Sequence, residues 1–168
     1  MLPRDLLADA FTRVREEVHA AVEGLDEDRL ARRLDADANS IAWLVWHLLR
    51  VQDDHVAEVA GREQVWTAGG WAARFALPFD ESATGYGHSS ADVGRVRASA
   101  ELLTGYCDAV TDQTQDYLGK LEADELDRVV DERWDPPVTL AVRLVSVISD
   151  DLQHAGQAAF VRGVLERR

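Results

Sequence analysis

The segment that decides the fold begins at a polar cap and continues as a nearly uninterrupted apolar run. It reads Asn39-Ser40-Ile41-Ala42-Trp43-Leu44-Val45-Trp46-His47-Leu48-Leu49. Asn39 or Ser40 can accept hydrogen bonds from the free amides of a first helical turn, and a glycine such as Gly61 commonly ends a helix. We therefore predict an apolar helix over residues 40–60.

Three further helices are predicted on either side of this segment. The first covers residues 3–23, with apolar side chains at helical spacing and Gly24 after its end. The next covers residues 91–118, with Ser89 or Ser90 as its cap, and the last covers residues 139–166, after the break at Pro136-Pro137. No alternating pattern is long enough for a sheet, although a short extended piece is expected near residues 126–130. The predicted fold class is all-α, an antiparallel four-helix bundle with one long crossover.

The crossover joins the second and third predicted helices and is about thirty residues long, more than a compact domain usually needs. Glycines alternate in it with aromatic residues, namely Trp66, Trp71, Phe75, Phe79 and Tyr86. Such a segment suits a packed lid or a pocket wall. It can equally be the cover of a helix end, and the sequence leaves both interpretations open.

Size and charge narrow the class of protein. The 168 residues fit a single domain, residues 1–168, and 46% hydrophobic with 29% charged residues is typical of a globular chain. The net charge of -13 disfavours nucleic acid and anionic membranes as partners. No apolar run approaches the ~20 residues that span a bilayer. The first residues lack a basic stretch followed by an apolar run, so we expect no signal peptide.

Cysteine usage indicates a reducing compartment. Cys107 is the only cysteine, so no intrachain disulfide can form, and we expect a cytoplasmic protein. Cys107 falls on the apolar seam of its predicted helix. We therefore interpret it as a buried structural residue and not as a nucleophile.

The candidate metal ligands are a histidine on one predicted helix and an acid–histidine pair on another. Asp150 and His154 are four residues apart and share one helix face, and His47 can complete the set from the neighbouring helix. Two imidazoles and a carboxylate suit zinc or a similar divalent ion, and three protein ligands leave one position open for water or substrate. Spacing alone does not decide between Asp150 and Asp151, because an acid three residues before a histidine can also share its face.

Other polar residues near this set are assigned different roles. Asp54 lies about 10 Å from His47 along the helix axis, too far to bind the same ion, but it can line the pocket and accept a proton from a substrate. Asp53 is expected to be solvated or salt-bridged, and His55 is excluded as a co-ligand because it lies about 12 Å along the axis. His19 is expected at the surface and His88 in a loop.

Several chemistries lack the residues they need. The sequence contains no glycine-rich phosphate loop, no Gly-x-Ser-x-Gly turn and no Cys-x-x-Cys. Carboxylate-bridged di-iron sites need Glu-x-x-His motifs on two helices. Only one acid–histidine pair is convincing here, which favours a single metal ion.

At these residues the chain resembles the DinB-like (DinB/YfiT-like) metalloenzyme superfamily. The resemblance covers nearly the whole chain, and its carriers are Ser40–His47 and the Asp150-x-x-x-His154-Ala155-Gly156-Gln157 motif. Many members have a histidine where this chain has Asp150. The acid is more similar to the mycothiol-dependent branch, and residues 66–87 and 145–163 resemble its mycothiol-utilising members. The resemblance implies a four-helix bundle, Asp150 as the ligand, a zinc- or nickel-like ion and frequent homodimers.

The resemblance also implies a reaction. Related proteins use the metal to bind a low-molecular-weight thiol as thiolate, whose pKa a divalent cation lowers. We therefore expect a divalent-metal-dependent thiol S-transferase, with mycothiol as co-substrate, that conjugates an electrophile in detoxification. We expect the metal to be zinc, with nickel, iron or manganese as alternatives. Two other functions remain open: a non-catalytic metal- or small-molecule-binding stress protein, and a metal-dependent hydrolase.

Overall fold

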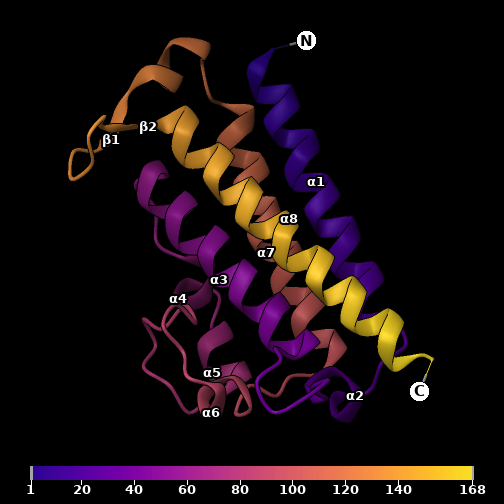
Figure 1. Ribbon diagram of the computed structural model, residues 1–168. Coiled ribbons are helices and arrows are strands. Elements are labelled where there is room, and N and C mark those ends of the chain that lie inside the picture. Colours follow the sequence, from indigo (N-terminus) through magenta and orange to yellow (C-terminus); the bar gives the residue numbers. More distant parts are fainter. Residues whose placement is uncertain (1, 168) are drawn as a thin grey trace.

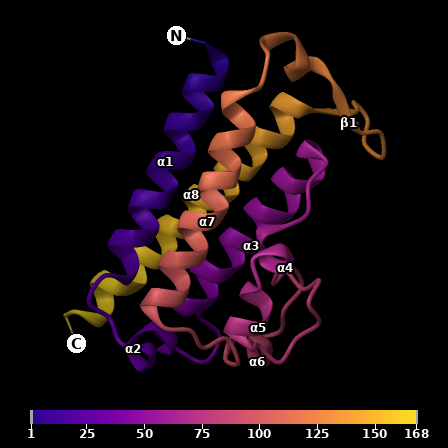
Figure 2. The same ribbon diagram turned by 180° about the vertical axis from the view of Figure 1, so that it is seen from behind.

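Four long helices form the body of the molecule in the computed structural model, which describes residues 2–167. They are α1 (Pro3–Val22), α3 (Ile41–Ala60), α7 (Ala100–Gly119) and α8 (Leu140–Leu165). Figure 1 shows that α1 and α8 run in one direction and α3 and α7 in the other. The most extensive packing is between α3 and α8 and between α1 and α7, which are both antiparallel pairs (Figure 2). The predicted all-α bundle is confirmed.

Short elements connect the long helices. The helix α2 (Glu27–Ala31) follows α1, and α4 (Val65–Ala68), α5 (Trp71–Phe75) and α6 (Ser90–Val93) lie in the long crossover between α3 and α7. A 3-10 helix η1 (Ala123–Asp127) leads into the strands β1 (Val129–Asp131) and β2 (Val138–Thr139). The strands pair antiparallel, with Val129 opposite Thr139 and Asp131 opposite Val138. This small hairpin lies near the extended piece expected around residues 126–130.

Polar side chains cap the beginnings of α3 and α8. The Ser40 side chain accepts a hydrogen bond from the backbone amide of Trp43, and Thr139 accepts one from Val142. Gly61 ends α3 in the left-handed conformation, at φ 62°. The bounds predicted for the second and fourth helices are therefore confirmed to within one residue, and the first helix ends one residue earlier than expected.

The predicted helix over residues 91–118 is wrong at its beginning. Ser89 caps only the short helix α6, in which Asp92 completes a capping box, and α6 ends at Gly94. The chain then restarts at Ser99, whose side chain accepts a hydrogen bond from Leu102 as the cap of α7. A second capping residue ten positions after the first therefore divides what the apolar spacing suggested was one helix. The short helix α2 was also not anticipated between Gly24 and Asn39.

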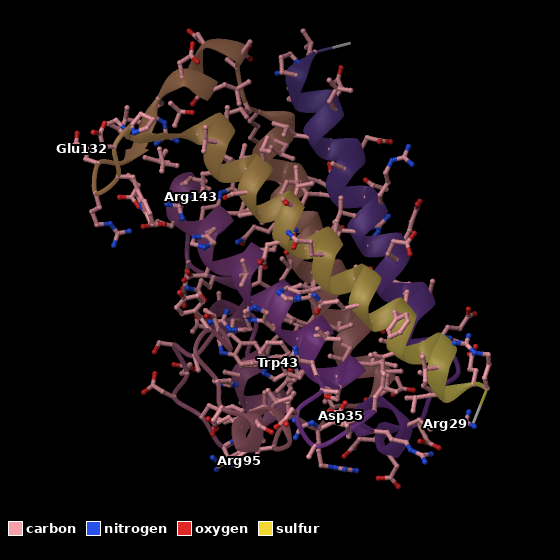
Figure 3. All side chains as sticks on the ribbon, in the orientation of Figure 1. Arg29, Asp35, Trp43, Arg95, Glu132 and Arg143 are labelled. Carbon is pink, nitrogen blue, oxygen red and sulfur yellow. The ribbon has the colours of Figure 1, made fainter. Side chains whose placement is uncertain are left out.

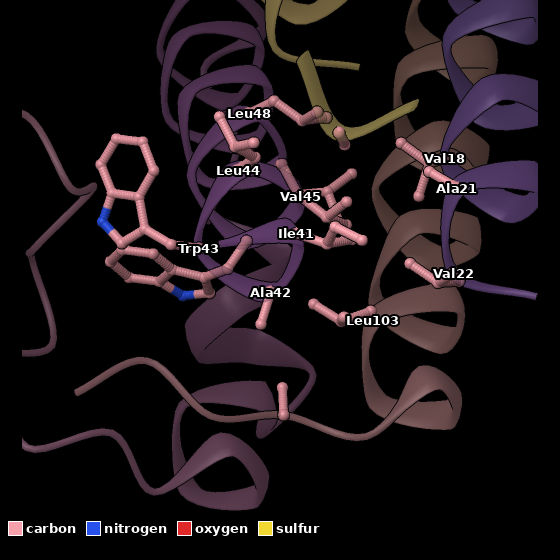
Figure 4. Close-up of a cluster of buried hydrophobic side chains, with 14 of the residues drawn as sticks. Val18, Ala21, Val22, Ile41, Ala42, Trp43, Leu44, Val45, Leu48 and Leu103 are labelled. Atoms are coloured by element: carbon pink, nitrogen blue, oxygen red, sulfur yellow. The ribbon is translucent and has the colours of Figure 1, made fainter. Parts of the chain in front are cut away.

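The core consists of two apolar clusters at different heights in the bundle. The larger cluster lies around the first half of α3, where Val18 and Val22 of α1 meet Ile41 and Val45 of α3 and Leu103 of α7 (Figure 4). The smaller cluster lies at the other end of the bundle, where Phe11, Val56, Leu118 and Leu144 pack together. Between the two lies a buried polar layer, composed of Gln52, Thr111, Thr114 and Asp151. The Gln52 amide donates to Thr114 Oγ1 at 2.9 Å.

The crossover is fixed to the bundle by a buried polar network. Asp53 accepts hydrogen bonds from the backbone amides of Val65 and Trp66, at 2.8 and 2.7 Å, and from the Tyr106 hydroxyl at 2.7 Å. Arg50 adds a cation–π contact at 4.8 Å from the Trp66 ring centroid. The beginning of the crossover is thereby held against both α3 and α7. Among residues 2–167, no helix has the length and apolar character needed to cross a lipid bilayer.

Candidate metal centre

The packing of α3 against α8 brings three candidate ligands together. His47 comes from α3, and Asp150 and His154 lie one turn apart on α8. One ligand atom from each lies within 4.8 Å of the other two. The His47 and His154 rings are 4.9 Å apart at their centroids, and His154 Nε2 lies 3.6 Å from Asp150 Oδ1. Residues far apart in the sequence thus form one compact cluster of donor atoms.

The crossover fixes the orientation of His47. The Nδ1 atom donates a hydrogen bond to the backbone carbonyl of Thr84 at 2.5 Å, because a carbonyl oxygen can only accept. Trp43 stacks on the imidazole at 4.6 Å between ring centroids, with 18° between the planes. With Nδ1 occupied, Nε2 is the nitrogen that remains for a ligand. This arrangement, in which the second ring nitrogen is held by a backbone carbonyl, is common among metal-binding histidines.

The other two residues also have donor atoms available. His154 Nδ1 lies 3.2 Å from Gln157 Oε1, which leaves Nε2 on the side of Asp150. Asp150 Oδ2 is buried and has no hydrogen-bond partner among residues 2–167. A buried carboxylate oxygen without a partner is costly unless a cation neutralises it. The three residues therefore fit a divalent ion, by donor type and by the unsatisfied oxygen alike.

Burial keeps His47 in the form that can bind a cation. Desolvation lowers the pKa of His47, and the positive field of His154 acts in the same direction. The hydrogen bond to Thr84 and the charge of Asp150 oppose this shift but do not reverse it. The neutral imidazole is the metal-binding form, so the local environment favours a vacant Nε2 lone pair near neutral pH.

Asp151, the alternative acid, does not belong to this cluster and is buried in the core. It is fully buried, and neither carboxylate oxygen has a partner in the described part of the chain. Burial raises the pKa of Asp151 well above its usual value, and neighbouring Asp150 raises it further. The geometry thus brings Asp150, and not Asp151, to His47 and His154.

A cavity of about 520 Å³ opens beside the donor cluster and is lined by two of the three candidate ligands, His47 and Asp150. It is bounded by α3, α8 and the crossover, through His47, Val51, Asp54, His55, Thr84, Tyr86, Ser146, Val147 and Asp150. Asp54 lines it as expected, and its Oδ1 accepts a hydrogen bond from the Gln64 amide at 2.7 Å. The volume lies within the range of small-molecule sites. A ligand in this cavity can reach the donor cluster at one end and Asp54 along the wall.

The remaining residues considered from the sequence lie outside the donor cluster. Asp53 is not solvated but buried, with Arg50 Nη1 at 3.7 Å, which agrees with the salt-bridged alternative. His19 is half-buried beside Asp108 of α7, its Nε2 2.9 Å from Oδ1. His88 is a loop residue as expected, but its Nδ1 accepts a hydrogen bond from Trp43 Nε1 at 3.2 Å. His88 therefore contributes to the support of Trp43, which stacks on His47.

Both interpretations of the crossover hold, for different parts of it. Trp66 and Phe75 are buried and pack with Tyr106 of α7, so they cover the bundle. Thr84 and Tyr86 instead line the cavity. The contact of Thr84 with His47 was not foreseen. The local signal that the sequence carries there is the pair of glycines after Thr84, Gly85 and Gly87, which both adopt positive φ in the structure.

Comparison with known proteins assigns the family. A profile of the mycothiol S-transferase family matches residues 6–167. The chain belongs to the mycothiol S-transferase family. This confirms the resemblance to the mycothiol-dependent branch of the DinB-like superfamily. This mycothiol S-transferase family member is also similar to a solved structure, the crystal structure of a conserved protein from Enterococcus faecalis. The TM-score is 0.93 and the sequence identity 27%, and the match covers 100% of this chain and 99% of that chain. Among proteins with curated functions, no match to the chain is found.

Proposed function

We propose that this protein is a divalent-metal-dependent thiol S-transferase that uses mycothiol as its thiol substrate. The observation that carries the proposal is the cluster of His47, Asp150 and His154 beside a cavity of about 520 Å³ that His47 and Asp150 line. The family match supports mycothiol as the thiol. An electrophile is the second substrate, and its conjugation is a detoxification reaction in the cytoplasm.

His47, Asp150 and His154 would hold one divalent ion, with zinc as the first choice and nickel, iron or manganese as alternatives. When bound, such an ion would stabilise the thiolate form of the substrate and lower the thiol pKa. The protein's part is to keep both imidazoles oriented through Thr84 and Gln157. Three protein ligands leave a coordination position for a substrate group.

We further propose that Asp54 accepts the thiol proton, directly or through a water molecule. Gln64 occupies Asp54 Oδ1, and the other carboxylate oxygen remains for the proton. The sulfur electron pair then forms the bond to the electrophilic carbon. Where the electrophile carries a halide, that leaving group departs with the electron pair of the broken carbon–halogen bond, and the proton passes to solvent.

The test is a transferase assay on the metal-loaded protein with mycothiol and a chloro-dinitrobenzene electrophile. We expect the thioether product to form with the native protein and to be lost in His154→Ala. Asp54→Asn should lower kcat and leave the metal content unchanged. Thiol binding without conjugation of any electrophile tried would overturn the transferase and favour a binding protein. Hydrolysis of esters or amides without thiol would favour the hydrolase.

A homodimer is also proposed, on the basis of the outer face of α8. Four large apolar side chains are exposed there: Val142, Val145, Leu152 and Phe160. Burial of such a stripe against a second copy would remove apolar surface from water. We expect a dimeric molar mass by light scattering, and a shift towards monomer in Phe160→Glu but not in Glu16→Gln on the exposed face of α1. A monomeric mass for the native protein would refute the dimer.

A further inference from the structure

His55 lies on the wall of the metal-site cavity, two turns of α3 beyond His47, and its ring is held by an arginine. Arg143 Nη1 lies 2.9 Å from His55 Nδ1. A guanidinium has only donors, so Nδ1 must be the acceptor and cannot carry a hydrogen. In the neutral imidazole the hydrogen is then on Nε2. The arginine contact therefore selects one tautomer of His55.

The arginine is itself fixed by the β1–β2 hairpin. Arg143 Nη2 donates to Asp131 Oδ2 at 3.1 Å, and Arg133 binds the same carboxylate at 2.9 and 2.8 Å. The hydrogen bonds from Arg133 lower the pKa of Asp131, so it stays a carboxylate. Figure 3 shows Arg143 near the beginning of α8, at the hairpin end of the molecule, and Trp43 towards the other end of α3. A hairpin remote from the candidate ligands thus fixes one residue of the cavity wall.

The charges around His55 come from two helices, α3 and α8. Asp54 and Glu58 lie on α3 itself, with Glu58 Oε2 4.0 Å from His55 Nδ1, and Asp150 and Arg143 face it from α8. Burial is the main reason that the pKa of His55 is lowered, and Arg143 lowers it further against the three acids. The ring is therefore neutral at physiological pH. In the described part of the chain, His55 Nε2 has no hydrogen-bond acceptor, while the residue lines the cavity.

These features define the group that this wall can bind. An Nε2–H donates a hydrogen bond, so its partner must be an acceptor, such as a hydroxyl, an amide carbonyl or a carboxylate. A carboxylate would be repelled by the nearby acids, Asp54, Glu58 and Asp150. An uncharged oxygen is favoured. Eight residues of helix separate His55 from His47 by about 12 Å along the axis, so the oxygen belongs to a part of the ligand remote from the sulfur.

We propose that His55 is a positioning residue that binds an uncharged hydroxyl or amide oxygen in the polar tail of the thiol, as an Nε2–H donor held in that tautomer by Arg143. The proposal rests on the proposed function for the identity of the ligand. It does not depend on the transfer step. The role of His55 is to orient the tail so that the sulfur reaches the donor cluster. We therefore expect replacement of His55 to change the affinity for the thiol and not the rate of the chemical step.

The first test is the tautomer of His55 in the metal-free protein without substrate. We expect nitrogen-15 chemical shifts of a single Nε2–H tautomer in the native protein at pH 7, and a mixture of tautomers in Arg143→Met. A native Nδ1–H tautomer or a protonated ring would overturn the proposal. This readout uses no activity, so it remains valid if the protein transfers no thiol.

The second test is calorimetric binding of mycothiol to the zinc-loaded protein. Loss of the donor in His55→Phe should weaken mycothiol binding about tenfold, the worth of one hydrogen bond, and His55→Gln, which keeps an N–H at similar reach, should restore most of it. Binding of 2-mercaptoethanol, which has no tail to reach His55, should be the same in all three proteins. The proposal would be overturned if His55→Phe bound mycothiol as tightly as the native protein does. It would also be overturned if His55→Phe lost as much affinity for 2-mercaptoethanol as for mycothiol, or if the native protein did not bind mycothiol. Mycothiol binding without conjugation would refute only the transferase.

Discussion

Gly85 lies directly against the imidazole of His47. A β-carbon placed on Gly85 would be 2.7 Å from His47 Nδ1 and 3.0 Å from the Trp46 ring. The residue also has φ +93°, a conformation that side-chain-bearing residues rarely adopt. The absence of a side chain therefore lets the crossover approach α3 closely enough for Thr84 to hold His47.

Replacement of this glycine should loosen the metal centre. In Gly85→Ala the new methyl group must displace the His47 ring or the Thr84 backbone, so the hydrogen bond that orients the ring weakens. We expect zinc affinity to fall about 10- to 100-fold, as for other losses of a ligand-orienting partner. Competition with a chromophoric chelator measures this change.

Gly87→Ala is the matched control for backbone strain. Gly87 also has a positive φ, +76°, but a β-carbon there would meet nothing within 4 Å in the described part of the chain. We expect a loss of stability of about 1–2 kcal/mol from strain in this variant, with unchanged zinc affinity. Equal zinc affinities in the two variants would show that Gly85 does not support His47.

The neighbouring acids Asp150 and Asp151 provide a test of the ligand set. Asp150 lies with His47 and His154, whereas Asp151 is turned into the core. Protein purified without added metal should contain about one divalent ion per chain, as a three-ligand site would. Metal analysis should find this ion lost in Asp150→Asn and His154→Ala and retained in Asp151→Asn. Loss in Asp151→Asn alone would contradict the assignment, and metal-free native protein after reloading would remove the metal centre altogether.

Much of the fold was predictable because its signals are local. The caps at Ser40 and Thr139 and the stop at Gly61 act within one helical turn, and each fixes a helix end at the predicted place. The break before α7 was missed because Val96 is buried although it is not helical, so its apolar character imitates a helix position. Apolar spacing reports burial, and burial alone does not distinguish a helix from a packed loop.

Helical periodicity made the candidate ligands of the site predictable, but not the residues that support them. Asp150 and His154 share a face through their spacing of four, His47 was proposed as the third ligand from its apolar helix, and the resemblance favoured Asp150 over Asp151. The contacts of Thr84 with His47 and of Arg143 with His55 join residues 37 and 88 positions apart, across elements whose relative placement no local pattern gives. The supporting residues of the site therefore required the three-dimensional structure.

The single cysteine should have no part in thiol transfer. Cys107 is fully buried, and burial raises its pKa to about 12, so the reactive thiolate is scarcely populated at neutral pH. We expect the native protein to resist iodoacetamide at pH 8 and to react only after unfolding, as followed by mass spectrometry. Cys107→Ala should retain mycothiol transfer with kcat within about twofold. A loss of transfer in a folded Cys107→Ala protein would indicate a thiol of the protein itself in the reaction.

Asp151 should make the stability of the bundle depend on pH. Its folded-state pKa is raised by burial, above an unfolded value of about 3.9, so the folded state keeps its proton where the unfolded state has released it. The contribution of this group is therefore fully present below pH ~4 and is lost as pH rises towards the folded pKa, by about 1.4 kcal/mol per pH unit. Asp151→Asn cannot ionise and removes this loss. Urea unfolding of the metal-free proteins should show a stability difference, variant minus native, that grows in favour of the variant from pH 4.5 to pH 8. A difference that stays constant over this range would mean that Asp151 is already ionised in the folded protein, and would contradict the raised pKa.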